Sequence, residues 1–188
     1  DGDPGTAEAP HVVNSSWTYA SPGCNLEFQL DLQALRAASI LPVFSAGNAG
    51  PGGSTSVSPA NNPEAFALGA IDDFDQGYYY SSRGPSSCGE AETIFPELVA
   101  PGVNIRTSDR YGTYSDASGT SLAAPHAAGA LALLLSARPA LNVDEQAHAL
   151  LAGAVDLGVP GADNDFGYGR LDALAAYQSL SGGGATPT

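Results

Sequence analysis

Two residue types are missing from the chain: its 188 residues include no lysine and no methionine. All six basic residues are therefore arginines, and 20 acidic residues bring the formal net charge to −14. Because nucleic acids and anionic membranes attract cationic surfaces, we expect both to be poor partners. A phosphate-binding Walker loop is also excluded, since it needs a lysine before its serine or threonine.

The missing methionine predicts that the chain was processed or trimmed upstream of Asp1, because translation starts with methionine. No signal peptide is visible, and no apolar stretch is expected to approach a membrane span. The acidic balance is typical of secreted or salt-tolerant proteins, although any soluble protein with an acidic bias shares it. We expect a secreted or extracytoplasmic protein without membrane contact.

Cysteine occurs only twice, at Cys24 and Cys88, and this spacing matches no metal-binding motif. The pair can form a disulfide, as in extracytoplasmic proteins, or remain two free thiols. Both cysteines lie in loops rich in serine, proline and glycine rather than in apolar runs, which favours the disulfide.

Apolar segments of strand length alternate with segments of helical periodicity, a pattern typical of α/β proteins with parallel strands and crossover helices. Asn142, with Glu145 three residues later, predicts a capped helix start. We expect one domain over residues 1–180 and a flexible tail at 181–188. The predicted strands are 11–17, 40–45 and 64–71, an apolar element at 97–105 interrupted by Pro-Gly, an exposed strand at 78–82 and a short one at 111–115. The predicted helices are 26–39 after an Asn25 cap, one from 120 to about 138, 143–152 and 171–177.

The segment around Ser121 opens a long run of alanine, glycine and leucine. Such a run predicts a helix that is apolar on every side and therefore buried. Pro125 falls in or near its first turn, where a missing N–H costs little. Thr120 or Ser121 could simply cap this helix. Alternatively, the unpaired N–H groups and the helix dipole make a serine here suited to chemistry that develops negative charge.

Asn48 is the second candidate, because it follows an apolar strand in a sharp glycine-rich turn. Asparagine is common in turns, but an amide opposite a helix-start serine is also what an oxyanion hole requires. A nucleophile elbow is disfavoured, since Ala123 stands where Gly-x-Ser-x-Gly needs its second glycine. The acidic segment 163–165 lacks the length of an EF-hand loop, and we interpret it as a turn.

Four short sequence blocks follow one another along the chain: Ser45-Ala46-Gly47-Asn48, Ser81-Ser82-Arg83-Gly84-Pro85, Val99-Ala100-Pro101-Gly102-Val103 and Gly119-Thr120-Ser121-Leu122-Ala123-Ala124-Pro125-His126. The same blocks in the same order are found in subtilisin-like serine proteases, which the chain resembles from about His11 to Tyr177. The Gly-Thr-Ser-x-Ala-x-Pro-His block is highly specific. The segments 12–17 and 41–44 are most similar to the bacillopeptidase F-like branch of that family.

The resemblance implies that Ser121 is the nucleophile and that Asn48 donates its amide to the oxyanion, with the Ser121 backbone N–H as second donor. It implies the C-terminal half of a three-layer α/β fold, with a mostly parallel sheet and helices on both faces. His126 would be structural, no residue is assigned to a metal, and calcium is implied by the resemblance alone. The implied substrate-binding residues are Ser16, Trp17 and Thr18 along the substrate backbone, and Ser45, Ala46 and Gly47 around the side chain before the cut.

The family places its aspartate and histidine motifs upstream of the serine, and neither an Asp-Ser/Thr-Gly nor a His-Gly-Thr-His block occurs in this chain. His11 and His148 lie outside any base motif, and a serine without a base is a weak nucleophile. We therefore expect the C-terminal half of a serine endopeptidase domain, acting on proteins or peptides but inactive alone. The strand at 11–16 would be an exposed edge, covered by the missing half or by self-association.

Two other interpretations stay open at this point. The chain could be a non-catalytic pseudoprotease or peptide-binding scaffold. It could also be one chain of a processed two-chain protease whose other chain supplies the aspartate and histidine.

Overall fold

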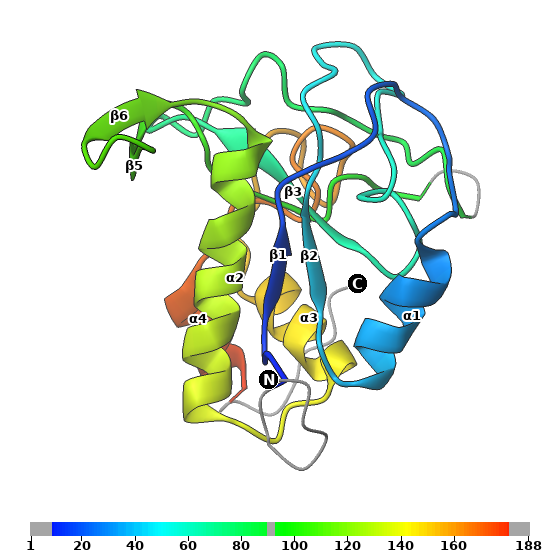
Figure 1. Cartoon of the computed structure of the whole chain (residues 1–188), viewed down its shortest axis with the longest axis vertical. Helices are drawn as coiled ribbons and strands as arrows, with labels where there is room; N and C mark the ends of the chain where they lie inside the picture. The colour runs from blue at the N-terminus through cyan, green and yellow to red at the C-terminus, as the bar shows by residue number, and fades with distance from the viewer. Residues whose placement is uncertain (1–8, 90–92, 181–188) are drawn as a thin grey trace.

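The computed structural model describes residues 9–89 and 93–180 and confirms the predicted α/β class (Figure 1). Four parallel strands form one sheet in the order β1-β2-β3-β4, and β5 pairs with β6 as a separate antiparallel hairpin. The strands are β1 (Val13–Ser15), β2 (Pro42–Ser45), β3 (Phe66–Ile71), β4 (Leu98–Pro101), β5 (Ile105–Ser108) and β6 (Tyr114–Ala117); the helices are α1 (Gln29–Ala37), α2 (Thr120–Ala137), α3 (Val143–Ala152) and α4 (Ala173–Ser179).

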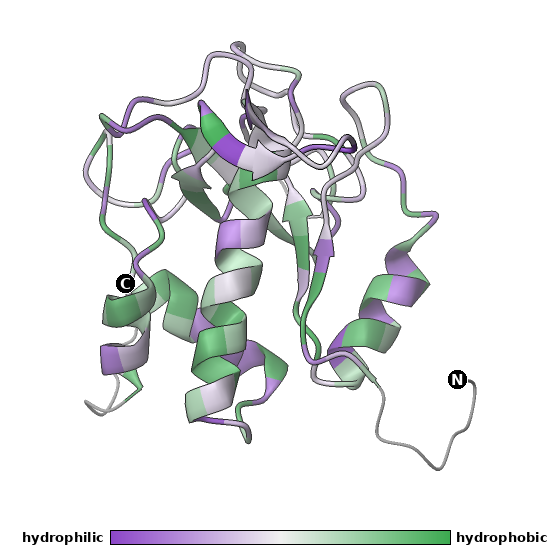
Figure 2. Ribbon diagram, turned by 60° about the vertical axis from the view of Figure 1, so that its left-hand side comes forward, coloured by the Kyte–Doolittle hydropathy of each residue, from purple (hydrophilic) through white to green (hydrophobic). Residues whose placement is uncertain are grey.

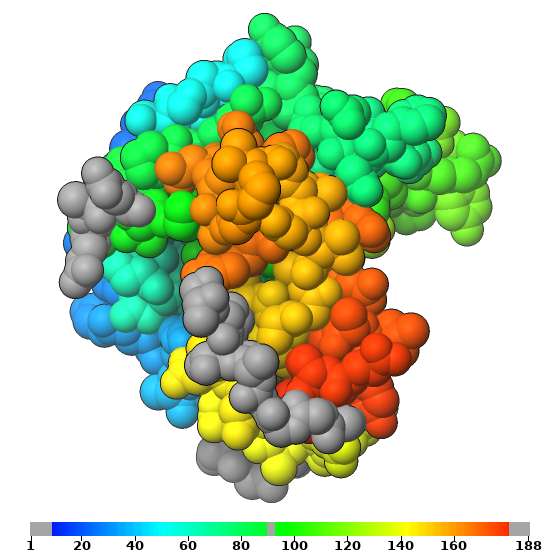
Figure 3. All heavy atoms as spheres, turned by 180° about the vertical axis from the view of Figure 1, so that it is seen from behind, coloured from blue at the N-terminus to red at the C-terminus, as the bar shows by residue number. Residues whose placement is uncertain are grey.

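Helices cover both faces of the sheet, because successive side chains of a strand point to opposite sides. Val43 of β2 belongs to the core shared with α2, α3 and α4, whereas the next residue, Phe44, belongs to the core shared with α1. Figure 1 shows α2 and α1 on opposite sides of the sheet, and Figure 3 shows α3 and α4 side by side on the reverse of the molecule. Strands β2 and β3 are buried along their whole length, as expected of a parallel sheet.

The predicted exposed strand at 78–82 is wrong, because these residues form a turn. The Ser81 N–H donates to the Tyr78 carbonyl at 2.9 Å and closes the turn, and the Tyr78 N–H donates to the Ala70 carbonyl at 2.8 Å without extending into a strand. The predicted element at 97–105 divides into β4 and β5 around Gly102. A Cβ on Gly102 would lie 2.7 Å from the Ala70 Cβ, so this close passage of the two chains requires glycine.

Helix starts differ from prediction in two places. The first helix begins at Gln29, since Asn25 accepts the Glu27 N–H in a preceding turn instead of capping the helix. Helix α4 begins two residues later than predicted, where the Asp172 side chain caps it. The capping box of α3 is confirmed. The predicted tail at 181–188 lies outside the described residues.

The prediction that α2 is buried on every side is also wrong. Eight residues of α2 are buried, but Leu133, on the side of the helix that faces away from the sheet, is 68% exposed. A groove of about 460 Å³ runs there past Pro125, His126 and Gly129, and Figure 2 colours this helix mostly from white to green. Contrary to expectation, α2 has the length and apolar composition of a membrane span; its packing against β1 to β4 accounts for that composition.

The Glu97 carboxyl group, just before β4, is hydrogen-bonded to the backbone of β3. Glu97 Oε2 accepts the Ala67 N–H at 2.6 Å, and the Glu97 N–H donates to the Ala67 carbonyl at 3.1 Å. Burial is the main cause that raises the pKa of Glu97 from 4.5 to about 7, against the opposing effect of the Ala67 N–H. The folded protein therefore keeps a proton there that the unfolded chain loses above pH 4.5.

We expect the free energy of unfolding to fall as the pH rises from 4.5 to about 7, because the folded state binds the extra proton in that window. Glu97→Gln should remove this slope and stabilise the protein by about 1–2 kcal/mol above the window. Urea unfolding on both sides of the window measures the effect, with the exposed change Asp73→Asn as control. An unchanged slope in Glu97→Gln would contradict the prediction.

Candidate active site

Ser121 is the second residue of α2 and does not cap the helix. The N-cap residue is Gly119, which has no side chain with which to cap the helix. The interpretation of Thr120 or Ser121 as a simple cap is therefore wrong. Backbone N–H groups of a first helical turn have no acceptor within the helix, so the Ser121 N–H lies at the positive end of the helix dipole without an intrahelical partner.

Pro125 links Ser121 to the end of β1. It is the sixth residue of α2, beyond the first turn, so its missing N–H removes the donor that the Ser121 carbonyl would otherwise receive. The Ser16 hydroxyl donates to that carbonyl instead, at 3.0 Å, and the Ser121 hydroxyl donates to the Ser16 carbonyl at 3.4 Å. The two serines, 105 residues apart in sequence, are thus joined in both directions.

Asn48 has its side chain anchored to the first turn of α2. Its Oδ1 accepts the Thr120 N–H at 3.1 Å and the Thr120 hydroxyl at 3.2 Å. The same hydroxyl accepts the Gly47 N–H at 3.2 Å. Because the carbonyl side of the amide is engaged by the residue next to Ser121, its two N–H donors are left on the opposite side.

The turn that carries Asn48 is held from behind by Ser82. The Ser82 N–H donates to the Gly47 carbonyl at 2.9 Å, and the Ala49 N–H donates to the Ser82 hydroxyl at 3.0 Å. A Cβ on Gly47, whose φ is +99°, would lie 2.9 Å from that hydroxyl. Thr120 and Ser82 therefore position Asn48, and we did not predict either role; their places inside two of the four blocks were the available signal.

The predicted substrate-binding residues lie on two sides of Ser121. Ser16, Trp17 and Thr18 continue beyond the end of β1, and the Trp17 ring packs edge-on against Phe28 and Phe44. Trp17 is still 46% exposed. By contrast, Ser45, Ala46 and Gly47 are buried at the end of β2.

No base accompanies the serine within the part of the chain that the structure describes. All three histidines are exposed there, and none is hydrogen-bonded to Ser121. The His126 Nδ1 lies 2.8 Å from the Leu122 carbonyl, which can only accept, so Nδ1 carries the proton. The ring is thereby held on the surface of α2.

Residues 9–89 and 93–180 contain no group of three or more His, Cys, Asp or Glu that could hold a metal ion. The interpretation of 163–165 as a turn is confirmed, since Asp163 Oδ1 accepts the N–H groups of Asp165 and Phe166, each at 2.8 Å. Calcium remains an implication of the resemblance alone.

A helix-start serine beside an anchored amide, at the carboxyl edge of a parallel sheet, is the arrangement with which serine hydrolases stabilise an oxyanion. Comparison with known proteins identifies the class further. The chain belongs to the Subtilase family, whose model matches residues 6–169. Members of this family are serine peptidases, and the predicted resemblance is confirmed.

The similar proteins support this assignment. Bacillopeptidase F of Bacillus subtilis is 41% identical over 192 residues, which cover 97% of this chain and 13% of that protein. Subtilisin BL of Lederbergia lenta is 33% identical over 88% of this chain and 56% of its own length. A solved mutant of the protease domain of PatA has the same fold, with a TM-score of 0.74 and 24% identity over 93% of this chain and 61% of that one. The chain thus spans less than two thirds of the length of each.

Proposed function

We propose that this chain carries the nucleophile and oxyanion hole of a subtilisin-type serine endopeptidase. The observation that supports this most strongly is the Asn48 amide, anchored through Oδ1 to Thr120 next to Ser121. Attack of the Ser121 hydroxyl on a peptide carbonyl creates an oxyanion, which the Asn48 amide and the Ser121 N–H stabilise. The amine leaves, an acyl-enzyme remains, and water then releases the acid.

The base that must take the proton from Ser121 comes, in this proposal, from outside the chain. The Ser121 hydroxyl donates to a backbone carbonyl, which is no base, and the sequence contains neither upstream motif of the family. The chain alone should therefore lack efficient peptidase activity. A pseudoprotease or peptide-binding scaffold needs neither Ser121 nor the anchored Asn48, and their geometry favours the catalytic proposal.

The partner that we propose is the preceding part of a subtilase domain. Strand β1 is an edge of the described sheet, and α2, which also contacts β1, has an exposed apolar side at Leu133. Both features expose groups that a folded domain normally covers. We also propose an extracellular location, because a 39% identical relative is named Halolysin-like extracellular serine protease Nep, of Natrialba magadii.

A fluorophosphonate probe tests the catalytic proposal, because it labels a serine only when a base activates it. The chain alone should stay unlabelled; the chain joined to the preceding part of the Bacillopeptidase F subtilase domain should be labelled at Ser121. Ser121→Ala should abolish that labelling, and the control Ser136→Ala on the same helix should not. Labelling of the isolated chain would refute its inactivity, and no labelling of the joined protein would refute the nucleophile.

Size-exclusion chromatography and binding of a hydrophobic dye test the partner. The chain alone should self-associate or bind the dye, and the preceding half should suppress both by covering the outer side of α2. Leu133→Ser should reduce dye binding of the chain alone without changing its circular dichroism, since this side chain is 68% exposed. A clean monomer without dye binding would count against the exposed interface.

A further inference from the structure

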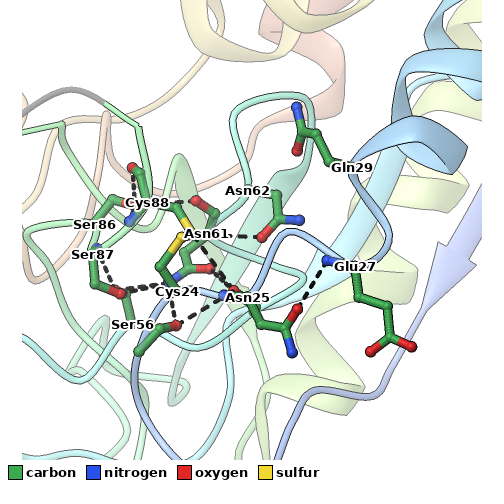
Figure 4. Close-up of a disulfide and its surroundings, with 12 residues drawn as sticks. Cys24, Asn25, Glu27, Gln29, Ser56, Asn61, Asn62, Ser86, Ser87 and Cys88 are labelled. Atoms are coloured by element: carbon green, nitrogen blue, oxygen red, sulfur yellow. Dashed lines mark hydrogen bonds between the residues drawn. A yellow bond between two sulfur atoms is a disulfide. The ribbon is translucent and has the colours of Figure 1, made fainter.

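A disulfide joins Cys24 to Cys88, which confirms the favoured pairing. Cys24 lies on the segment that continues from the substrate-binding residues at 16–18, and Cys88 follows the Arg83-Gly84-Pro85 block. Figure 4 shows the disulfide surrounded by polar side chains from three separate loops. Cys88 is buried, at 3% exposure, whereas Cys24 is exposed at the surface.

Asn61 is the centre of this polar cluster. Its buried side chain donates to the Gly23 carbonyl and to the Ser56 hydroxyl, each at 3.1 Å, and to the Ser87 hydroxyl at 2.9 Å. Its Oδ1 accepts the Ser58 hydroxyl at 2.6 Å. A single amide therefore ties together the segment before Cys24, the loop that contains Asn61 itself, and the loop that leads into Cys88 (Figure 4).

The segment 19–25 depends on these contacts for its position, because it lies outside every strand and helix. The Tyr19 N–H donates to the Ser58 carbonyl at 2.8 Å, the Gly23 N–H to the Ser56 carbonyl at 3.1 Å, and the Asn25 N–H to the Ser58 hydroxyl at 2.8 Å. All three donors thus bind the loop that Asn61 organises. Displacing this segment would move the neighbouring Thr18 and Trp17.

We propose that the Cys24–Cys88 disulfide and Asn61 together position the substrate-binding residues 16–18, so that reduction of the disulfide weakens polypeptide binding. The proposal rests on the proposed function of that segment. A dithiol reductant transfers two electrons and two protons to the sulfur pair, leaving two protein thiols and a cyclic disulfide of the reductant. Cys24 is the exposed residue of the pair, so we expect the reductant to attack from its side.

Trp17 provides a direct probe, because it is the only tryptophan in the chain and packs against Phe28 and Phe44. Dithiothreitol should shift its fluorescence to longer wavelength as the segment loosens. Hydrogen exchange should accelerate about tenfold or more at the amides of Tyr19, Gly23 and Asn25, while the amides of β3 keep their protection. Neither measurement needs a reactive Ser121, so a failure of the catalytic proposal leaves this test intact.

Asn61→Ala should reproduce the faster exchange without reductant, and Cys24→Ser combined with Cys88→Ser should abolish the response to dithiothreitol. Asn142→Ala is the matched control, since it removes an asparagine whose side chain also forms hydrogen bonds with the backbone, but at the distant start of α3. In the protein joined to the preceding half, Asn61→Ala should raise KM about tenfold and leave kcat within about twofold.

The proposal is overturned if exchange at 19–25 is unchanged after complete reduction, verified by alkylation of both thiols. It is equally overturned if all amides, including those of β3, accelerate together, because the disulfide would then stabilise the fold as a whole. A fall in kcat with unchanged KM would assign Asn61 to catalysis instead of substrate positioning.

Discussion

Asn48→Ala is expected to lower kcat of the joined protein by about 10²–10³-fold, with little change in KM. The cause is the loss of one of two oxyanion donors, whose contribution exists only in the transition state. This magnitude is the one established for the loss of the corresponding donor in subtilisin, and it does not come from the structure of this chain. Steady-state hydrolysis of a peptide substrate measures it.

Asn48→Asp provides the control for the alanine variant. Aspartate keeps an oxygen for the Thr120 N–H and hydroxyl, which hold the side chain at 3.1 and 3.2 Å, but it has no amide donor. It should therefore fold as stably as the parent and be at least as slow as Asn48→Ala. Activity in Asn48→Asp close to that of the parent would show that this residue acts through its anchor rather than its amide.

Leu131→Ala is expected to lower the free energy of unfolding by about 2–5 kcal/mol. Leu131 lies on the inner side of α2, is fully buried, and belongs to the core that α2 shares with the sheet, α3 and α4. Removing the Leu131 side chain leaves a cavity between α2 and the sheet. The two elements are already closely packed and cannot move together to fill it. Urea unfolding followed by circular dichroism measures the loss.

Leu133→Ala is the matched control on the same helix. It deletes the same atoms two residues further along, where the side chain is 68% exposed. A change of less than about 0.5 kcal/mol is expected there in the chain alone. Equal losses in the two variants would mean that the outer side of α2 is packed, and would contradict the assignment of that side to an interface.

The class of fold and the candidate pair Ser121 and Asn48 followed from local patterns. Strands β2 and β3 are short apolar runs between turn residues, the capping box predicts α3, and four ordered blocks point to Ser121 and Asn48. These features depend on neighbours in sequence, so a sequence carries them. The absence of both upstream motifs is likewise read directly from the sequence.

Tertiary structure alone decided which groups meet. The run at 127–135 looks equally apolar on all sides, because only packing on the sheet distinguishes the inner Leu131 from the outer Leu133. Pro125 cannot donate a hydrogen bond to the Ser121 carbonyl, and only the tertiary structure shows that the Ser16 hydroxyl donates to it instead. The pairing of Cys24 with Cys88 through Asn61, and the anchoring of Asn48 by Thr120, join loops far apart in sequence. Such contacts depend on how the sheet brings strand ends together, which no local pattern encodes.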